Sequence, residues 1–211
     1  MDYSLLKTAL RQKILPAVTF SSIDEVLPVT EALRKGGLEV MEVTFRTGAA
    51  AAALELIRRN FPDMYVGAGT LLSPAQVNEA IDAGAQFGLA PGFNPSVCSQ
   101  TIKNNFPFVP GVMSPSEVEG SAEMGFTILK LFPAAQINGP EFLKALYSTY
   151  TQLQVQFIPM GGVSIKNIRD YLQLKNVIAV GGSWLASREL ISSKDFNGIT
   201  ERVQEVLRQI I

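Results

Sequence analysis

Short apolar runs alternate with longer amphipathic segments along nearly the whole chain. Eight of these runs are rich in β-branched or aromatic residues and have Gly, Pro or Ser at or near their ends, which is typical of strands. Because the pattern recurs so regularly, it predicts a repeated strand-and-helix unit. The expected strands are 14–20, 40–46, 64–70, 87–92, 108–113, 127–133, 157–162 and 177–184.

The segments between the runs have the spacing of helices that lay an apolar face against a sheet. Several open with a capping residue followed by Pro or an acid, and many end at Gly, as helix ends prefer. A further amphipathic segment, 1–13, precedes the first strand. The clearest expected helices between strands are 21–37, 73–84, 94–104, 114–125 and 164–174.

Eight strands, each followed by a helix, predict the α/β class and a (β/α)₈ TIM barrel with an extra N-terminal helix. A doubly wound open sheet is the alternative, but it usually has fewer strands and a Gly-rich fingerprint after the first, which this chain lacks. No linker or low-complexity tract divides the sequence. We expect one domain, 1–211, with the N-terminal helix at 1–13, the barrel core at 14–186 and C-terminal helices at 187–211.

Composition and charge narrow the function. The 211 residues are 47% hydrophobic, which supports a substantial core, and 18 basic residues nearly balance 19 acidic ones. The basic residues are scattered, so we expect no nucleic-acid partner and no anionic membrane surface. The lone Cys98 and the absence of histidine argue against a disulfide scaffold and a His-based metal site. We therefore expect no metal.

The start of the chain carries charges at short intervals and lacks the apolar region of a signal peptide. No later segment has the roughly 18 uninterrupted apolar residues of a membrane-spanning helix. A cytoplasmic location is the resulting expectation.

One strand, "TILKLFP", carries a charge among apolar residues. Alternate side chains of a strand share a face, so Lys130 lies with Ile128 and Phe132 while the two leucines face the outer helices. We therefore expect Lys130 to point into the barrel, near the carboxyl-terminal strand ends where barrel chemistry takes place.

The strand 40–46 has the same character, because Glu42, Thr44 and Arg46 share one face. A carboxylate, a guanidinium and an amine inside one barrel are costly to desolvate unless they pair or take part in chemistry. One interpretation is therefore a structural ion pair between Lys130 and Glu42 and nothing more.

A second interpretation gives these side chains a reaction. Burial and a neighbouring cation such as Arg46 favour the neutral amine of Lys130, which can attack a carbonyl and form a Schiff base. The protonated imine withdraws electrons, so a nearby carbon–carbon bond can break without a metal or an organic cofactor. Glu42 would move the protons, taking one from a hydroxyl and giving one to the enamine carbon.

Glycine pairs follow the last two strands. They are Gly161 with Gly162, and Gly181 with Gly182, the second pair being followed by Ser183. Loops at these two places, with accessible backbone N–H groups, form the phosphate site common in this fold. One Gly-Gly is more simply a tight turn, but two pairs at these positions favour a phosphate or carboxylate site.

Three more strand-end residues are weaker candidates. Thr70 ends its strand with a hydroxyl that could hold a substrate carboxylate, although such a threonine is usually a helix cap. Pro91 and Phe132 could form apolar walls around a small ketoacid, or they could be ordinary turn and core residues.

The segments "EVTFRT", "VGAGT", "PG", "KLFPA", "GGV" and "GGSW" resemble, in order and spacing, the 2-keto-3-deoxy-6-phosphogluconate (KDPG) and 4-hydroxy-2-oxoglutarate (KHG) aldolase family. The similarity covers about residues 14–186. It implies a class I aldolase without a cofactor, usually a homotrimer. Its implied ligands are a phosphorylated keto-sugar acid and pyruvate: KDPG yields pyruvate and glyceraldehyde 3-phosphate, and KHG yields pyruvate and glyoxylate.

The resemblance implies roles for the residues already singled out. Lys130 matches the Schiff-base lysine, and Glu42 matches the general acid/base. The positions around the pyruvate moiety match Arg46, Thr70, Pro91 and Phe132, and those of the phosphate site match Gly161, Gly162 and Ser183.

One position departs from the family pattern. The family commonly has Thr before the glycine pair, where this chain has Met160. A threonine hydroxyl can hydrogen-bond to substrate hydroxyls, whereas a thioether is a poor acceptor and donates nothing. We therefore expect weaker discrimination at C4, which makes the galactonate-derived epimer an alternative substrate. The first strand also lacks an arginine that some members carry.

Two other functions fit the same residues. A phosphate-sugar isomerase or epimerase would use Glu42 as a base and Lys130 as an electrostatic aid. A non-catalytic binding protein would use both as a structural pair. Only the aldolase interpretation predicts that borohydride traps pyruvate covalently on Lys130.

Overall fold

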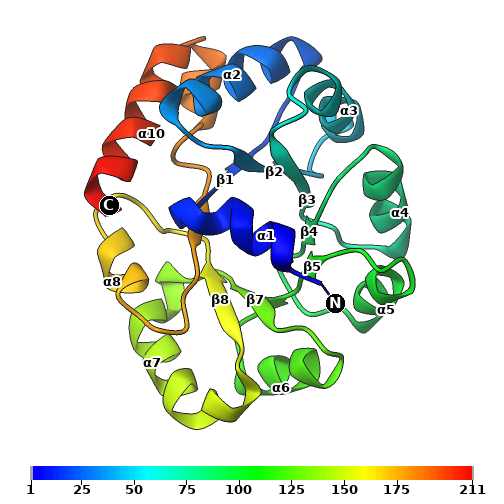
Figure 1. Ribbon diagram of the computed structural model, residues 1–211, viewed down its shortest axis with the longest axis vertical. Helices are drawn as coiled ribbons and strands as arrows, with labels where there is room; N and C mark the ends of the chain where they lie inside the picture. The colour runs from blue at the N-terminus through cyan, green and yellow to red at the C-terminus, as the bar shows by residue number, and fades with distance from the viewer. Residues whose placement is uncertain (1, 211) are drawn as a thin grey trace.

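The computed structural model describes residues 2–210. In it, a ring of parallel strands is surrounded by helices (Figure 1). Met1 and Ile211, the first and last residues of the predicted domain, lie outside the described residues. The strands are β1 (Ile14–Val18), β2 (Val40–Thr44), β3 (Tyr65–Gly69), β4 (Gly88–Leu89), β5 (Phe108–Val109), β6 (Gly111–Val112), β7 (Ile128–Leu131), β8 (Gln156–Pro159) and β9 (Val180–Gly182).

The strands follow the order of a closed barrel. One sheet runs β5-β4-β3-β2-β1-β9 and the other runs β6-β7-β8. The predicted strand 108–113 is interrupted at Pro110, which has no N–H to donate, and its halves pair with opposite neighbours. Between β8 and β9, Phe157 N–H donates to Asn176 (2.7 Å) and Ile178 N–H donates to Phe157 (3.1 Å). The predicted (β/α)₈ barrel is confirmed.

Capping residues begin several of the outer helices, as the sequence predicted. Ser73, Asn94 and Ser114 each accept a backbone N–H bond from the first turn, and each is followed by Pro. The helices are α1 (Ser4–Ala9), α2 (Val26–Gly36), α3 (Ala50–Asn60), α4 (Pro74–Asp82), α5 (Pro95–Lys103), α6 (Pro115–Glu123), α7 (Gly139–Tyr150), α8 (Ile168–Leu172), α9 (Arg188–Ser192) and α10 (Phe196–Ile210).

Some boundaries differ from those expected. The segment 21–37 begins with a 3₁₀ turn, Ile23–Glu25, before α2, and the expected helix 164–174 is helical only over α8. Two helices, α3 and α7, have no side-chain cap at their first turn, so the capping pattern did not mark them. The helices α2 and α8 also lack such a cap and still lie in predicted segments, so the start signals were not the only guide.

The core has two layers that follow the alternation of the strands. Met41 and Val43 of β2 and Leu129 of β7 belong to the layer between the strands and the helices. Val40 and Ile128, on the other face of the same strands, belong to the cluster inside the barrel. This separation confirms the two faces that the sequence pattern predicted for these strands.

The N-terminal helix α1 lies across one end of the ring (Figure 1). Leu6 and Leu10 join the interior cluster there, and the Tyr3 hydroxyl donates to the carbonyl of Phe108 at 2.6 Å. The amino end of the barrel is therefore covered, and the opposite end is left for ligands.

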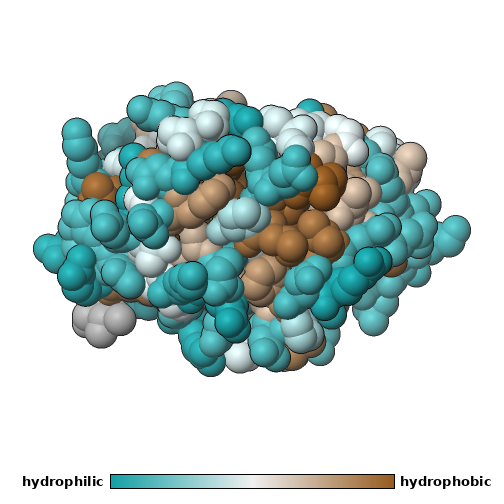
Figure 2. Space-filling model, turned by 90° about the horizontal axis from the view of Figure 1, so that it is seen from above, coloured by the Kyte–Doolittle hydropathy of each residue, from teal (hydrophilic) through white to brown (hydrophobic). Residues whose placement is uncertain are grey.

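The face of the molecule on the side of α2 and α10 is mainly polar (Figure 2). Seen from the side of α2 and α10, hydrophilic residues cover most of the molecule, and apolar residues gather in one central area (Figure 2). Within residues 2–210, none of the helices has the length and apolar character that crossing a bilayer requires.

Candidate active site

A pocket of about 440 Å³ lies at the carboxyl end of the barrel. The loops after β1, β2, β7, β8 and β9 contribute to it, so it lies where barrel enzymes place their chemistry. Its lining residues are Ala17, Thr19, Glu42, Thr44, Arg46, Lys130, Phe132, Met160, Gly161, Gly162, Val163, Gly182, Ser183, Trp184, Ser187 and Arg188.

Lys130 and Glu42 meet at the bottom of this pocket. The distance from Lys130 Nζ to Glu42 Oε1 is 3.6 Å, and the side chains are only 5% and 1% exposed. The lysine ammonium also lies 5.5 Å from the centre of the Phe132 ring. The second oxygen of Glu42, Oε2, is buried without a hydrogen-bond partner among the described residues. The pair is therefore largely dehydrated and incompletely satisfied, which is costly for a purely structural contact.

The room for the Glu42 carboxylate comes from the neighbouring strand. Glu42 is level with Gly67 in the pairing of β2 with β3, and Gly69 lies two residues further along. A Cβ atom on Gly69 would overlap the Glu42 carboxylate. Only glycine fits at this position while the carboxylate keeps its place. Sequence reasoning missed Gly69 because its partner is 27 positions away in the chain.

Arg46 and Thr70 lie together at the rim of the pocket. Arg46 Nε donates to Thr70 Oγ1 at 3.3 Å. Arg46 lines the same pocket as Glu42 and Thr44, but β2 ends at Thr44 and Arg46 is exposed at the mouth instead of lying in the barrel interior. The alternation placed all three on the pocket side, and only Glu42 and Thr44, which lie within the strand, are buried.

The loops after β8 and β9 line the other side of the pocket. Gly161 (φ 85°) and Gly162 (φ 78°) are in the left-handed region that side chains disfavour. A Cβ on Gly161 would also press on the Phe132 ring, and one on Gly162 would overlap Ala135. Both glycines are thus required by the loop, and Ser183 lies in the same lining.

Met160 is buried and lines the pocket immediately before this glycine pair. Pro91 and Thr70 are not among the lining residues. Thr70 reaches the pocket through Arg46, whereas Pro91 packs against Gly111, where an added Cβ would overlap its backbone. The structure therefore brings together most of the predicted site residues and leaves Pro91 aside.

Several lining residues were not singled out as site residues by the sequence. Thr19 and Thr44 join neighbouring strands through a hydroxyl contact of 2.7 Å at the pocket wall. Trp184 and Arg188 enter the lining from the loop after β9. The alternation placed Thr44 on the inward face, but no local pattern distinguishes the other three from ordinary loop residues.

The fold and the pocket together define a class of protein. A dehydrated lysine lies beside a carboxylate, with an arginine and a glycine-rich loop on either side, and these are the kinds of group that a class I aldolase on a (β/α)₈ barrel requires.

Comparisons with known proteins identify the family. The family model described as KDPG and KHG aldolase matches residues 5–202. A 2-dehydro-3-deoxy-phosphogluconate aldolase of Haemophilus influenzae is 43% identical over 92% of this chain and 91% of its own length. A KHG/KDPG aldolase of Escherichia coli K12 is 36% identical over 92% and 90%. The chain therefore belongs to the KDPG and KHG aldolase family.

A solved structure agrees with this assignment. The KDPG aldolase of Legionella pneumophila, in which pyruvate was captured as a covalent carbinolamine, superimposes with a TM-score of 0.91 at 38% identity. The match covers 95% of this chain and 97% of that one.

Proposed function

We propose that this protein is a class I aldolase that cleaves KDPG to pyruvate and glyceraldehyde 3-phosphate through a Schiff base on Lys130. The observation that carries the proposal is the buried contact of 3.6 Å between Lys130 and Glu42 in the carboxyl-end pocket. The relatives named as KDPG aldolases and the carbinolamine structure support the same reaction.

Lys130 begins the reaction as the nucleophile. Its amine attacks the C2 carbonyl of the substrate, and the carbinolamine loses water to give a protonated imine. Because the pocket wall around Lys130 is apolar on the Phe132 side, few water molecules compete for the imine. The positive imine then accepts the electron pair of the C3–C4 bond.

Glu42 moves the proton that this cleavage requires. Its carboxylate removes the proton of the C4 hydroxyl, the C3–C4 bond breaks, and the aldehyde leaves while C1–C3 remain as an enamine. The same carboxyl then returns the proton to C3, and hydrolysis of the imine releases pyruvate. The free lone pairs of Glu42 Oε2 suit this role, because no group on the described residues occupies them.

The two sides of the pocket suit the two ends of the substrate. Arg46, supported by Thr70, is a donor for the carboxylate next to the carbonyl, and Phe132 forms an apolar wall beside the methylene carbon. On the other side, Gly161, Gly162 and Ser183 offer donors to the phosphate. We assign Pro91 only an indirect part, through its packing on Gly111.

KHG is a second proposed substrate. It shares the 2-keto and 4-hydroxy groups on which the chemistry acts, and the E. coli relative is named for both reactions. Because KHG carries a carboxylate in place of the phosphate arm, its cleavage tests how far the distal side of the pocket contributes. The buried Met160 adds a further proposal, acceptance of the C4 epimer of KDPG.

We also propose that residues 1–211 form one domain that assembles as a homotrimer. Leu72, Ile102 and Met113 are between 45% and 56% exposed and come from neighbouring strand-and-helix units. Large exposed apolar side chains in one sector favour burial by another copy. Sedimentation equilibrium measures the assembly, and a monomeric wild type would contradict the proposal.

The reaction is tested by trapping. Wild-type protein is incubated with pyruvate and borohydride and digested, and the masses of its peptides are measured by mass spectrometry. The aldolase proposal requires a reduced pyruvate adduct on Lys130, and KDPG in place of pyruvate should give the same adduct, because its cleavage leaves C1–C3 as an imine on this lysine. An isomerase or a binding protein gives no adduct, so an unmodified Lys130 peptide would reject the mechanism.

A further inference from the structure

Arg188 is one of three cationic side chains in the pocket lining. Lys130 is paired with Glu42 at the bottom of the pocket, and Arg46 is hydrogen-bonded to Thr70 just after the ends of β2 and β3. Arg188 begins α9, the helix that follows β9, and lines the pocket together with Gly161, Gly162 and Ser183. It is therefore the one cation of the described lining that contacts neither Glu42 nor Thr70.

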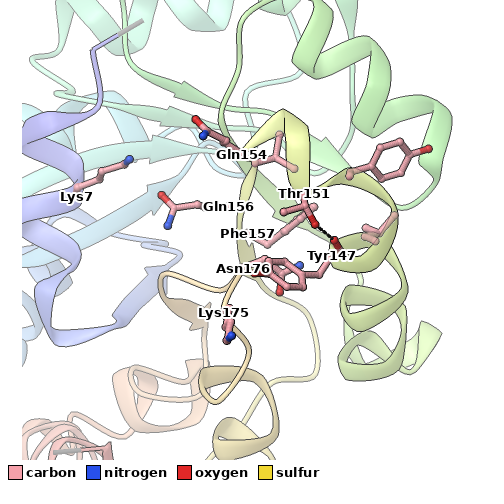
Figure 3. A pocket seen from close by; sticks show the side chains of 11 residues that line it. Lys7, Tyr147, Thr151, Gln154, Gln156, Phe157, Lys175 and Asn176 are labelled. Atoms are coloured by element: carbon pink, nitrogen blue, oxygen red, sulfur yellow. Dashed lines mark hydrogen bonds between the residues drawn. The ribbon is translucent and has the colours of Figure 1, made fainter.

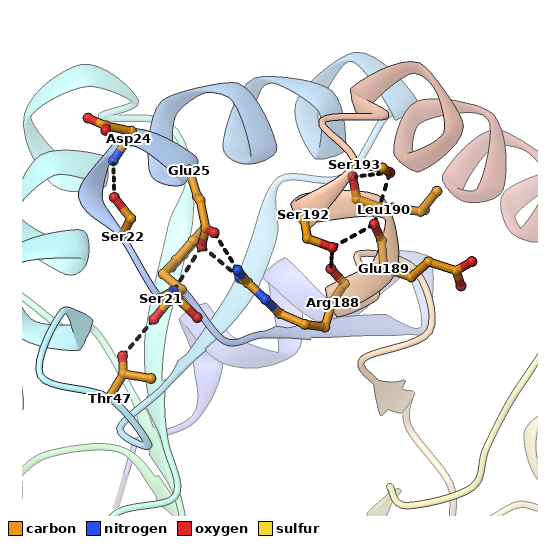
Figure 4. A network of polar contacts seen from close by, with 11 residues as sticks. Ser21, Ser22, Asp24, Glu25, Thr47, Arg188, Glu189, Leu190, Ser192 and Ser193 are labelled. Atoms are coloured by element: carbon orange, nitrogen blue, oxygen red, sulfur yellow. Dashed lines mark hydrogen bonds and ion pairs between the residues drawn. The ribbon is translucent and has the colours of Figure 1, made fainter.

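The guanidinium of Arg188 is held by a partner far away in the sequence. Its Nη1 donates to Glu25 Oε2 at 2.9 Å and its Nη2 donates to Glu25 Oε1 at 2.7 Å, across 163 positions of the chain. Glu25 also accepts from the backbone N–H of Ser21 at 2.8 Å. Figure 4 shows the resulting network, in which the loop after β1 and the start of α9 meet through this pair.

The pair leaves donors available. A guanidinium has five N–H groups in a rigid plane, and two of them bind Glu25, so three remain. Bidentate contact fixes the orientation of the plane before a ligand arrives, which lowers the entropy lost on binding. The hydrogen bonds from Arg188 hold the pKa of the Glu25 carboxyl below its ordinary value, so the pair persists at neutral pH.

A structural role alone explains this arrangement poorly. The Arg188 side chain is 50% exposed, and an ion pair with that much solvent contact contributes on the order of 1 kcal/mol or less. Because Arg188 lines the pocket, its remaining N–H groups can also bind a ligand there, and the oxygen acceptors of a phosphate match the planar donors of arginine.

We propose that Arg188 is a specificity-determining residue that binds the phosphate of the substrate, and that Glu25 is its positioning residue. The inference rests on the proposed aldolase function and adds a side-chain donor to the backbone groups of Gly161 and Gly162. In this arrangement the pocket binds a three-part ligand, with Arg46 at one end, Lys130 in the middle and Arg188 at the other end.

Kinetics on two substrates test the proposal. kcat/KM is measured with KDPG and with the unphosphorylated acid for the wild type, Arg188→Ala and Arg188→Lys. Arg188→Ala should lower the ratio of kcat/KM for KDPG to that for the unphosphorylated acid by about 10- to 100-fold, mainly through KM. Arg188→Lys keeps the charge but loses the planar donors, so its ratio should fall between the two.

The control removes a similar ion pair elsewhere. Arg11 pairs with Glu39 at 2.6 Å, both side chains are exposed, and Arg11 does not line the carboxyl-end pocket. Arg11→Ala should leave the substrate ratio at the wild-type value. Thermal melts show whether each variant is folded at the assay temperature.

Binding without turnover separates the possible failures. Glyceraldehyde 3-phosphate is titrated into wild type and Arg188→Ala, and the variant should bind it at least about tenfold more weakly. An unchanged substrate ratio with unchanged product affinity would overturn the role of Arg188, even if pyruvate is trapped on Lys130. Equal losses on both substrates would also overturn it, since they indicate a structural role. Absence of the Lys130 adduct would instead reject the aldolase function.

Discussion

Two cavities of the same size, about 440 Å³ each, lie at different parts of the barrel. The carboxyl-end pocket contains a lysine and a glutamate that are almost completely buried. The second cavity lies beside α7 and β8 and contains Lys7 and Lys175, both exposed, with Gln154, Gln156 and Tyr147 (Figure 3). No ion pair joins its lysines to an acid within residues 2–210.

The two cavities differ in the burial of charge and not in volume, and on this difference we base the choice of the proposed active site. An exposed lysine keeps its hydration shell, so the second cavity can attract anions but does not hold a dehydrated amine beside a carboxylate. A dehydrated lysine beside a carboxylate is energetically expensive, and its cost is offset when the two groups carry out chemistry. The following changes test this contrast, from the largest expected effect to the smallest.

Lys130→Met should abolish turnover, because a thioether cannot form the imine. We expect kcat to fall by about 10⁴-fold or more, measured by coupled release of pyruvate from KDPG. Lys175→Met makes the same exchange in the second cavity and should retain wild-type kcat. Comparable losses in both variants would contradict the distinction between the two cavities.

Changes to Lys130 and Glu42 should affect the free energy of unfolding and the catalytic activity differently. Lys130→Met leaves Glu42 buried without its partner, which costs about 3–5 kcal/mol of unfolding free energy. The double variant Lys130→Met/Glu42→Gln should recover much of that loss while remaining inactive. Urea titrations measure the free energy of unfolding of the single and the double variant. A double variant that is no more stable than the single one would refute this account of the pair.

Glu42→Gln should slow the reaction without preventing imine formation. The amide has nearly the shape of the carboxylate but cannot accept and return the proton, so kcat should fall by about 10²- to 10⁴-fold. Borohydride should still trap pyruvate on Lys130. Loss of the adduct together with turnover would assign Glu42 to imine formation instead of to bond cleavage.

Gly69→Ala should disturb the site through packing alone. The added Cβ overlaps the Glu42 carboxylate, so we expect lower kcat and a loss of about 1–3 kcal/mol of unfolding free energy. Gly48→Ala is the matched control, because no heavy atom lies within 4 Å of the Cβ it would add. If both variants melt at the same temperature, the close approach of Gly69 and Glu42 is not a constraint.

Met160→Thr should sharpen the choice between C4 epimers by about tenfold, the value of one hydrogen bond to a substrate hydroxyl. The measurement is the ratio of kcat/KM for KDPG to that for its C4 epimer. Met160→Leu has similar size and no donor, so it should keep the wild-type ratio. Equal discrimination by wild type and Met160→Thr would show that this side chain does not contact C4.

Much of the barrel could be predicted because its rules are local. Strand alternation is a period of two, so it placed Glu42 and Lys130 inside and Leu129 outside without any knowledge of the fold. The same rule put Arg46 on the pocket side but not at its depth, since nothing in the sequence marked the end of β2 at Thr44. The helices α4, α5 and α6 were marked by their capping residues, whereas α3 and α7, which have no side-chain cap, were expected only from the strand-and-helix repeat.

The sequence by itself determined which side chains enter the barrel, because alternation and glycine placement act over a few residues. Only the tertiary structure decided which of them meet. Three contacts join segments that are far apart in the sequence: Lys130 with Glu42 at 3.6 Å, Gly69 against the same carboxylate, and Glu25 with Arg188. Their distances depend on how the strands close into a ring, and the periodicity of a short segment carries no information about that closure.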